Sequence, residues 1–173
     1  IDDPHLVSDL ISAGDLVVLV VPIDLSAPKG RLILPQVQTL RDILDADAVS
    51  LMLKEGELAQ ALVRLNGPPK LVICDSQVVQ KVAADTPLSI RMTTFSILMA
   101  RFKGDIVGLA AGAGMISRLQ PGDRVLIAEA CAHHVLADDI GRVKIPRWLR
   151  QYAGGDLDVE VRSGRDFPED LTP

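Results

Sequence analysis

Short apolar runs recur along the chain, separated by stretches in which polar and apolar positions are mixed. The first run, 16–21, contains only Leu and Val, which is typical of a strand covered on both faces in a parallel sheet. Pro22 ends this run. By the same reasoning, further strands are predicted at 48–53, 71–74, 89–92, 125–128 and 157–161, the last one from its period-two alternation.

The stretches between these runs carry helical signals. Apolar positions 34, 37, 40 and 44 keep helical spacing, and Pro35 suits the first turn of that helix. Asp75 or Ser76 can cap a helix that runs to about residue 84, and Thr93 or Thr94 can cap one that runs to residue 101. Further helices are predicted over 55–65, 105–119 and 145–152.

Strands and helices therefore alternate with short connections, which predicts parallel sheets covered by helices. The fold class is α/β and Rossmann-like, arranged as two consecutive small domains. We place the first domain at residues 1–92, with a short lead-in at 1–13, and the second at 93–173. The two domains are joined without a flexible linker. The sequence shows no internal repeat of fixed period.

Composition narrows the range of functions. Apolar residues make up 48% and charged residues 24% of the chain, as in an ordinary globular protein. Aromatic residues make up only 3% and the net charge is −5, so nucleic-acid binding is not expected. No apolar run approaches the roughly 20 residues of a membrane span. With two cysteines and no secretory signal, we expect a cytoplasmic protein, and the Ile at position 1 suggests an internal part of a longer chain.

The glycine-containing segments of the chain do not match the usual nucleotide-binding motifs. The chain contains no G-x-x-x-x-G-K-[ST] phosphate loop. Small residues gather inside the predicted helix 105–119, which we interpret as allowing close approach of a neighbouring helix: Gly108, Ala110, Ala111, Gly112, Ala113 and Gly114. The Lys29-Gly30-Arg31 loop lies between a strand and a helix, where an anion could bind, but we favour a solvated connection.

The strongest chemical signal is the Cys131-Ala132-His133-His134 segment directly after the strand 125–128. Ligands of open parallel sheets bind outside the carboxyl ends of the strands. Thiolate and imidazole suit zinc, copper or iron–sulfur clusters, although one Cys-x-His cannot complete a tetrahedral site. The alternative is an inert cysteine beside two solvated histidines. Cys74 has no adjacent histidine, so we interpret it as a small buried hydrophobe.

The chain resembles the HydF family of [FeFe]-hydrogenase maturation factors from about residue 7 to residue 173. The resemblance rests on long strings that are peculiar to the family: Val20–Asp24, Ala27–Thr39, Thr94–Leu98, Ala128–His134 and Asp139–Leu149. It implies a dimerisation domain followed by a domain that binds a [4Fe-4S] cluster and takes part in tetramer formation. The family's GTPase domain is not matched here, so GTP binding and hydrolysis would belong to residues outside this chain.

The family's cluster motif is Cys-x-His, a long spacer, then His-Cys-x-x-Cys. The resemblance implies that Cys131 is an iron ligand, that His133 is a ligand or a supporting group, and that His134 is a less certain neighbour. The second half of the motif is not in this chain, so the chain as given is expected to lack a stable cluster. Arg142, Lys144 and Arg147 would add positive potential near the cluster, or form an ordinary solvated helix face.

The leading hypothesis is a non-catalytic, cytoplasmic scaffold that carries the diiron precursor of the hydrogenase active site. Its expected partners are further copies of itself, in a homodimer or a homotetramer, the radical-SAM maturases and the [FeFe]-hydrogenase, with no nucleic acid and no membrane. Two alternatives remain open at this point. One is a stand-alone Cys/His zinc metalloenzyme, and the other is a nucleotide-binding module that uses the 29–31 loop.

Overall fold

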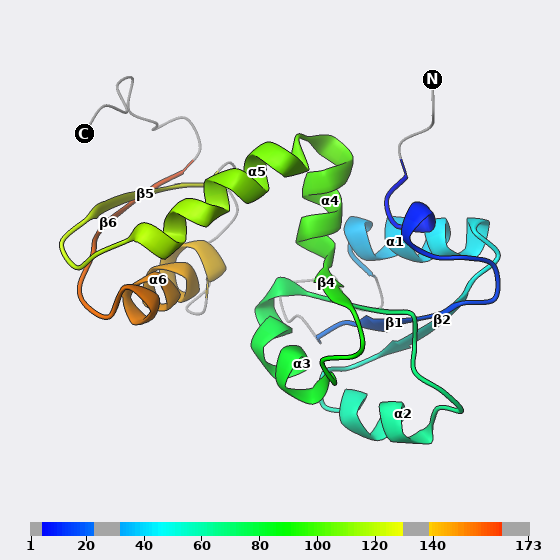
Figure 1. Ribbon diagram of the computed structural model, residues 1–173. Coiled ribbons are helices and arrows are strands. Elements are labelled where there is room, and N and C mark those ends of the chain that lie inside the picture. The colour runs from blue at the N-terminus through cyan, green and yellow to red at the C-terminus, as the bar shows by residue number, and fades with distance from the viewer. Residues whose placement is uncertain (1–4, 23–31, 130–138, 164–173) are drawn as a thin grey trace. The chain divides into compact units, whose positions relative to one another are not determined.

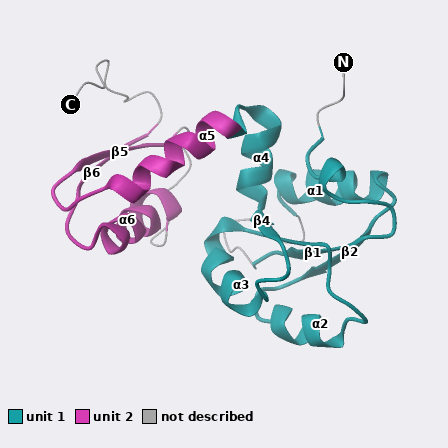
Figure 2. Ribbon diagram, in the orientation of Figure 1, with its two compact units in different colours: residues 1–106 teal, residues 107–173 magenta. Residues whose placement is uncertain are grey.

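The computed structural model describes residues 5–22, 32–129 and 139–163. The chain forms two compact units, residues 1–106 and residues 107–173, which we describe separately (Figure 2). Residues 93–106, which the sequence-based boundary places in the second domain, belong to unit 1. The physical reason is that Phe95 and Leu98 are buried in the core of that unit.

Unit 1 is built on a four-stranded parallel sheet in the order β2-β1-β3-β4 (Figure 1). The strands are β1 (Leu16–Val20), β2 (Val49–Leu53), β3 (Leu71–Cys74) and β4 (Met92–Thr94). All of β3 and all but the first residue of β1 are buried, as expected for apolar strands in the middle of a covered sheet. The predicted α/β class with parallel strands is confirmed.

Helices cover both faces of this sheet. They are α1 (Leu34–Asp45), α2 (Leu58–Arg64), the 3-10 turn η2 (Ser76–Val78), α3 (Val79–Asp85) and α4 (Phe95–Lys103). On one face Val17 and Leu19 pack in a cluster with Ile43 of α1. On the other face, Val18 and Val20 pack with Leu58, from α2, and with Val82, from α3. Successive residues of β1 thus serve opposite cores, because side chains alternate along a strand.

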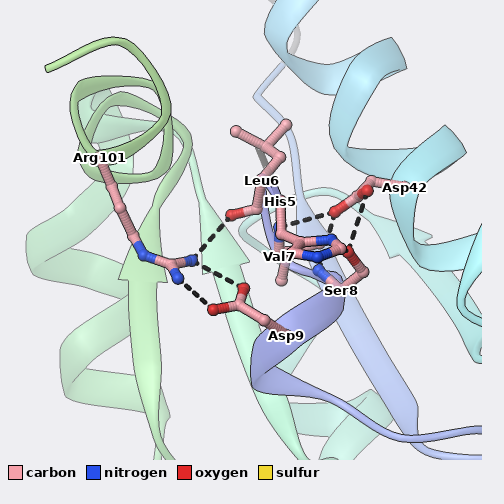
Figure 3. A network of polar contacts seen from close by, with 7 residues as sticks. All are labelled: His5, Leu6, Val7, Ser8, Asp9, Asp42 and Arg101. Atoms are coloured by element: carbon pink, nitrogen blue, oxygen red, sulfur yellow. Dashed lines mark hydrogen bonds and ion pairs between the residues drawn. The ribbon is translucent and has the colours of Figure 1, made fainter. Parts of the chain in front are cut away.

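The segment before β1 is part of unit 1 rather than a loose lead-in. Leu6, Val7 and Ile11 are buried in the same cluster as α1 and α4, around the 3-10 turn η1 (Ser8–Leu10). Figure 3 shows the polar contacts that fix this segment. The Asp42 carboxylate accepts hydrogen bonds from the backbone N–H groups of Val7, at 2.7 Å, and Ser8, at 2.8 Å.

Unit 2 contains a two-stranded parallel sheet with far less burial. Its elements are α5 (Ile106–Ala113), the 3-10 turn η3 (Gly114–Arg118), β5 (Arg124–Glu129), the π-helical turn η4 (Ile140–Lys144), α6 (Ile145–Ala153) and β6 (Asp158–Ser163). Val125 and Ile127 of β5 lie opposite Val159 and Val161 of β6. No residue of either strand is fully buried.

The predicted helix starts are confirmed where a polar side chain precedes the helix. Asp75 accepts a hydrogen bond from the Gln77 backbone N–H at 2.9 Å, and Thr94 accepts one from Ile97 at 3.1 Å. The predicted helix 105–119 is instead an α-helix followed by a 3-10 turn, with glycine at the junction, Gly114. Within the described residues, no helix is long and apolar enough to cross a membrane.

Candidate functional site

The three sequence-predicted ligands, Cys131, His133 and His134, lie outside the described residues. The structure describes the residues on either side of positions 130–138, and we call Glu129, Asp139, Gly141, Arg142 and Ser163 the frame. β5 ends at Glu129, and the chain resumes at Asp139 at the start of η4. Both points lie at the carboxyl end of the unit 2 sheet, where ligands of parallel sheets commonly bind.

Arg142 ties this frame together. Its Nε lies 3.3 Å from Oε2 of Glu129, and its Nη2 lies 3.0 Å from Oγ of Ser163, the last residue of β6. The Glu129 side chain is only 14% exposed, so this ion pair is largely shielded from water on the carboxylate side. One guanidinium therefore joins the carboxyl ends of both strands.

Asp139 orders the other end of the frame. This buried residue caps η4, with Oδ1 accepting a hydrogen bond from the Arg142 backbone N–H at 2.8 Å. Its backbone carbonyl accepts from the N–H groups of Val143 and Lys144. Gly141 is buried between two carboxylates: a Cβ placed there would lie 3.5 Å from Asp139 Oδ1 and 3.6 Å from Glu129 Oε1.

The three predicted basic residues occupy different surroundings. Arg142 is paired with Glu129, so the carboxylate offsets much of its charge. Lys144 is half-buried at the end of η4, and Arg147 is exposed on α6. The Arg142 side chain contacts Glu129 and Ser163 at the carboxyl ends of β5 and β6. Within the described ranges, no three His, Cys, Asp or Glu residues gather as metal ligands would.

Cys74 is confirmed as a buried hydrophobe. It ends β3, has no exposed surface and packs in the unit 1 core with Val72 and Val82. Burial, and then the charge of Asp75, raise the pKa of its thiol to about 12. A thiol with this pKa is protonated at neutral pH and is neither a good nucleophile nor a ready metal ligand.

Sequence reasoning missed two sets of polar residues near the carboxyl edges of the sheets. Glu129 and Asp139 lie on either side of the Cys131 segment in the sequence, and this position could have indicated that they support it. The contact of Ser163 with Arg142 depends on the pairing of β5 with β6, which the sequence alone does not give. In unit 1, Ser76 and Ser96 are joined by a hydrogen bond between their hydroxyls at 2.9 Å. The 29–31 segment, which the sequence makes a candidate anion site or a solvated connection, lies outside the described residues.

Comparison with solved structures finds ATP-bound MatB from Rhodopseudomonas palustris, at 14% identity and a TM-score of 0.41. The match covers 92% of this chain and 43% of that one. An ATP-bound RpMatB-BxBclM chimera matches at 15% identity and a TM-score of 0.40, over 94% of this chain and 43% of the other. This chain thus spans less than half the length of either protein. No curated protein matches the chain.

Two family models match consecutive parts of the chain. Residues 6–104 match the hydrogen maturase F dimerization domain, and residues 107–173 match the hydrogen maturase F tetramerization domain. The gap between the matches falls at the division between the two compact units. Both domains are oligomerisation domains, which supports homo-oligomerisation of this chain. The chain belongs to the hydrogen maturase F (HydF) family and contains its dimerization and tetramerization domains.

Proposed function

We propose that this chain is the non-catalytic, homo-oligomeric scaffold region of a protein that assembles the active-site cluster of [FeFe]-hydrogenase in the cytoplasm. The observation that carries this proposal is the match of two oligomerisation domains of the hydrogenase maturation family over nearly all of the sequence. In this role, the partners would be the radical-SAM maturases that build the diiron precursor and the hydrogenase that receives it. GTP binding would belong to residues outside this chain.

Within that function, we assign Cys131 as a ligand of a [4Fe-4S] cluster, with His133 as a further ligand or supporting group and His134 as a less essential neighbour. The donor types fit in part, because such clusters are usually held by cysteine thiolates and this loop supplies one. The other cysteine, Cys74, is buried in unit 1. A complete cluster therefore needs further thiolates from outside these 173 residues.

The frame supports this assignment. Glu129 and Asp139 bring the two ends of the loop to one place, and Arg142 links them to β6. We assign Arg142 chiefly to ordering the loop ends, because its charge is offset by Glu129. The same proposal gives Lys144 and Arg147 the role of adding positive potential for an anionic iron–sulfur or cyanide-bearing species.

The test is anaerobic reconstitution with iron and sulfide, followed by metal and sulfide analysis and EPR of the reduced sample. It is run on this chain and on a natural longer protein that contains it and carries the further cysteines. We expect little cluster on the chain alone and near-stoichiometric cluster on the longer protein. Cys131→Ala in the longer protein should abolish or cripple loading, whereas Cys74→Ala, the matched cysteine control, should leave it unchanged.

Other outcomes would overturn the proposal. Full loading of the Cys131→Ala variant would show that this thiolate is not a ligand. Stoichiometric zinc without sulfide, lost on Cys131→Ala, would support a zinc site instead. Unchanged precursor loading after replacing both Lys144 and Arg147 with Gln would remove their electrostatic role while leaving the cluster assignment intact.

A further inference from the structure

Three charged residues stand at the amino ends of neighbouring strands in unit 1. Asp15, Lys70 and Arg91 are the residues directly before β1, β3 and β4, which lie side by side in the sheet. The Lys70 backbone N–H donates to the Leu16 carbonyl at 2.8 Å. The Val72 backbone N–H donates to the Arg91 carbonyl at 3.0 Å. Since paired strands lie about 4.8 Å apart, the pairing brings the three charged residues to one edge of the sheet.

A pocket of about 660 Å³ lies at this edge, and the three charged residues line it. Small-molecule sites typically have volumes of about 300–1,000 Å³ and are lined by apolar side chains with a few polar groups. Here the apolar part of the lining comes from the start of β1 and from the loop between α2 and β3: Leu16, Leu65, Pro68 and Pro69. All of the lining belongs to unit 1, so the pocket is a feature of that unit by itself.

The lining of the pocket carries an excess of positive charge. It contains two cations and one carboxylate, in a chain whose net charge is −5. Asp15 offsets Lys70 only in part, because Nζ of Lys70 lies 3.8 Å from Oδ2 of Asp15. The same oxygen accepts a hydrogen bond from the Ser12 backbone N–H at 2.8 Å. The pocket therefore favours a ligand with negative charge.

The Arg91 guanidinium is the strongest binding group of the pocket. Among the described residues, it has neither a hydrogen bond nor an ion pair. In the same unit, the guanidinium groups of Arg41 and Arg101 pair with the carboxylates of Asp45 and Asp9. A guanidinium presents a planar fork of N–H donors, which matches the two oxygens of a carboxylate or a phosphate. Arg91 thus offers this fork to a ligand.

The pocket has a defined shape without a ligand. Proline fixes one backbone dihedral angle, and two consecutive prolines, Pro68 and Pro69, lead into β3. Pro69 is buried. The backbones of Lys70 and Arg91 are held by their hydrogen bonds to the neighbouring strands. Binding therefore orders few further groups, which lowers its entropic cost.

We propose that this pocket binds a small organic anion, in which a carboxylate or a phosphate ester is attached to a short apolar body. Arg91 binds the oxyanion through its fork, and Lys70 adds a second positive charge. Leu65 and Pro69 contact the apolar body. Asp15 is a positioning residue that keeps Lys70 at the edge of the sheet. The volume of the pocket exceeds that of a lone phosphate or carboxylate group, so a body attached to the oxyanion is part of the proposal.

A small molecule fits this pocket better than an acidic protein segment. Two cations offset by one carboxylate suit a ligand with one or two negative charges. Asp47 is exposed, and its carbonyl accepts a hydrogen bond from the backbone N–H of Gly14, a lining residue, at 2.9 Å. This carboxylate adds negative charge beside the pocket and disfavours a chain that carries many carboxylates.

The first test is isothermal titration calorimetry of the whole chain, at low salt and without iron or sulfide. The probes are 3-phenylpropionate, phenyl phosphate and the neutral 3-phenylpropionamide. We expect at least one of the two anions to bind with a dissociation constant below about 1 mM, and the tighter one identifies the head group. The amide should bind at least about 10-fold more weakly, because it has no charge for Arg91 to pair with. Equal binding of the amide would overturn the proposal.

Variants test the residues. Arg91→Gln should raise the dissociation constant of the tighter anion about 10-fold or more, and Lys70→Gln should raise it about 3-fold or more. Lys103→Gln is the matched control, because it removes the same charge from an exposed position of α4 that does not line the pocket. Far-UV circular dichroism checks that the variants are folded. An unchanged affinity for Arg91→Gln would overturn the proposal, as would an equal loss for Lys103→Gln.

Nuclear magnetic resonance of the ¹⁵N-labelled chain locates the bound anion. The backbone amide signals of Gly14, Gly67 and Lys70 should shift on titration. Those of Ser76 and Ser96, which follow β3 and β4 at the opposite edge of the sheet, should not. Shifts at the two serines alone would overturn the proposal, as would binding of a hexaglutamate peptide but of neither small anion. Because no cluster is involved, these outcomes are independent of the cluster assignment.

Discussion

The two compact units differ in how well each buries its own sheet. In unit 1, β1 and β3 lie in the middle of four strands with a packed apolar cluster on each face. In unit 2, β5 and β6 pair only with each other in the described structure, and none of their residues is fully buried. Leu157 is the one fully buried large hydrophobic residue described there.

This contrast separates a self-sufficient unit from one that depends on further contacts. A two-stranded sheet is marginal in water by itself. In unit 2, charged residues alternate with Val along β6, so the sheet has one apolar side. In α5 and η3 of this unit, the apolar side chains of Val107, Leu109 and Met115 are exposed. The unit that matches a tetramerization domain therefore has exposed apolar side chains, and its strands contain fewer buried residues than those of unit 1.

The largest effect should come from a strand position in the unit 1 core. Ile73→Ala, at a side chain with no exposed surface, should lower the free energy of unfolding by about 2–5 kcal/mol, because it leaves a cavity. Leu126→Ala, at a half-buried position of β5, should lower the free energy of unfolding by less than about half of the loss expected for Ile73→Ala. Urea titrations followed by circular dichroism measure this, and the fluorescence of the single tryptophan, Trp148 of α6, reports on unit 2. Equal losses for both variants would contradict the contrast.

The next effect concerns the N-terminal segment of unit 1. Asp42→Ala should lower the free energy of unfolding by about 1–3 kcal/mol, because it removes the acceptor for two part-buried backbone N–H groups, those of Val7 and Ser8. Asp45→Ala, one turn further along α1, removes only an exposed pair with Arg41 and should leave the urea midpoint unchanged. If both variants behaved alike, the segment before β1 would not be held by Asp42.

A pair of glycines sharpens the comparison inside unit 2. A Cβ at Gly155 would lie 2.7 and 2.8 Å from ring atoms of Pro121, which cannot move aside, so Gly155→Ala should destabilise by about 1–3 kcal/mol. Gly112→Ala has open space around it and should stabilise the dilute chain by up to about 1 kcal/mol, as Ala does in a helix. Thermal unfolding at low protein concentration measures both. Opposite signs are expected, and matching losses would show that Gly112 is already packed within the chain.

The elements of unit 1 were predictable because their signals are local. The run 16–21 needs no distant partner to be recognised as a buried strand, and Asp75 and Thr94 cap the turns that follow them directly. The role of the first residues was not predictable. Leu6, Val7 and Ile11 show no helical or strand period, and Asp42, the carboxylate that holds them, is 35 residues away.

The sequence predicted the donor residues of the candidate site, but it did not predict the contacts that hold the residues around them. The Cys131 segment is recognisable from the sequence because thiol and imidazole side chains follow a strand. Its role in binding a cluster stays a prediction. The contact between Arg142 and Ser163 spans 21 residues and depends on how β5 and β6 pair, which no single stretch reveals. In α5, the small residues predicted a neighbouring helix, and this stays a prediction here.

The smallest effect is a pH dependence that tests how firmly the N-terminal segment belongs to unit 1. Arg101 of α4 donates hydrogen bonds to both carboxylate oxygens of Asp9 and to the backbone carbonyl of Leu6, at 3.4 Å for the latter (Figure 3). The hydrogen bond from Arg101 lowers the pKa of Asp9 below its ordinary value. Both side chains are about one third exposed, 29% for Arg101 and 35% for Asp9, so water weakens the pair.

The sign of this effect follows from the lowered pKa. In the unfolded chain Asp9 takes up its proton near its ordinary pKa of about 3.9, whereas the folded chain keeps it ionised to lower pH. The pair therefore stabilises the fold fully above about pH 4 to 5, and this contribution is lost as the pH falls through the folded pKa. Urea midpoints measured from about pH 6 to about pH 3 should fall less steeply for Asp9→Asn than for the parent chain, with Arg101→Gln reproducing the shallower slope. Asp45→Asn is the control: it removes the carboxylate of the exposed pair with Arg41 and should change the slope less, because water screens that pair more strongly. Identical slopes for Asp9→Asn and the parent chain would show that the N-terminal segment is held by its apolar residues alone.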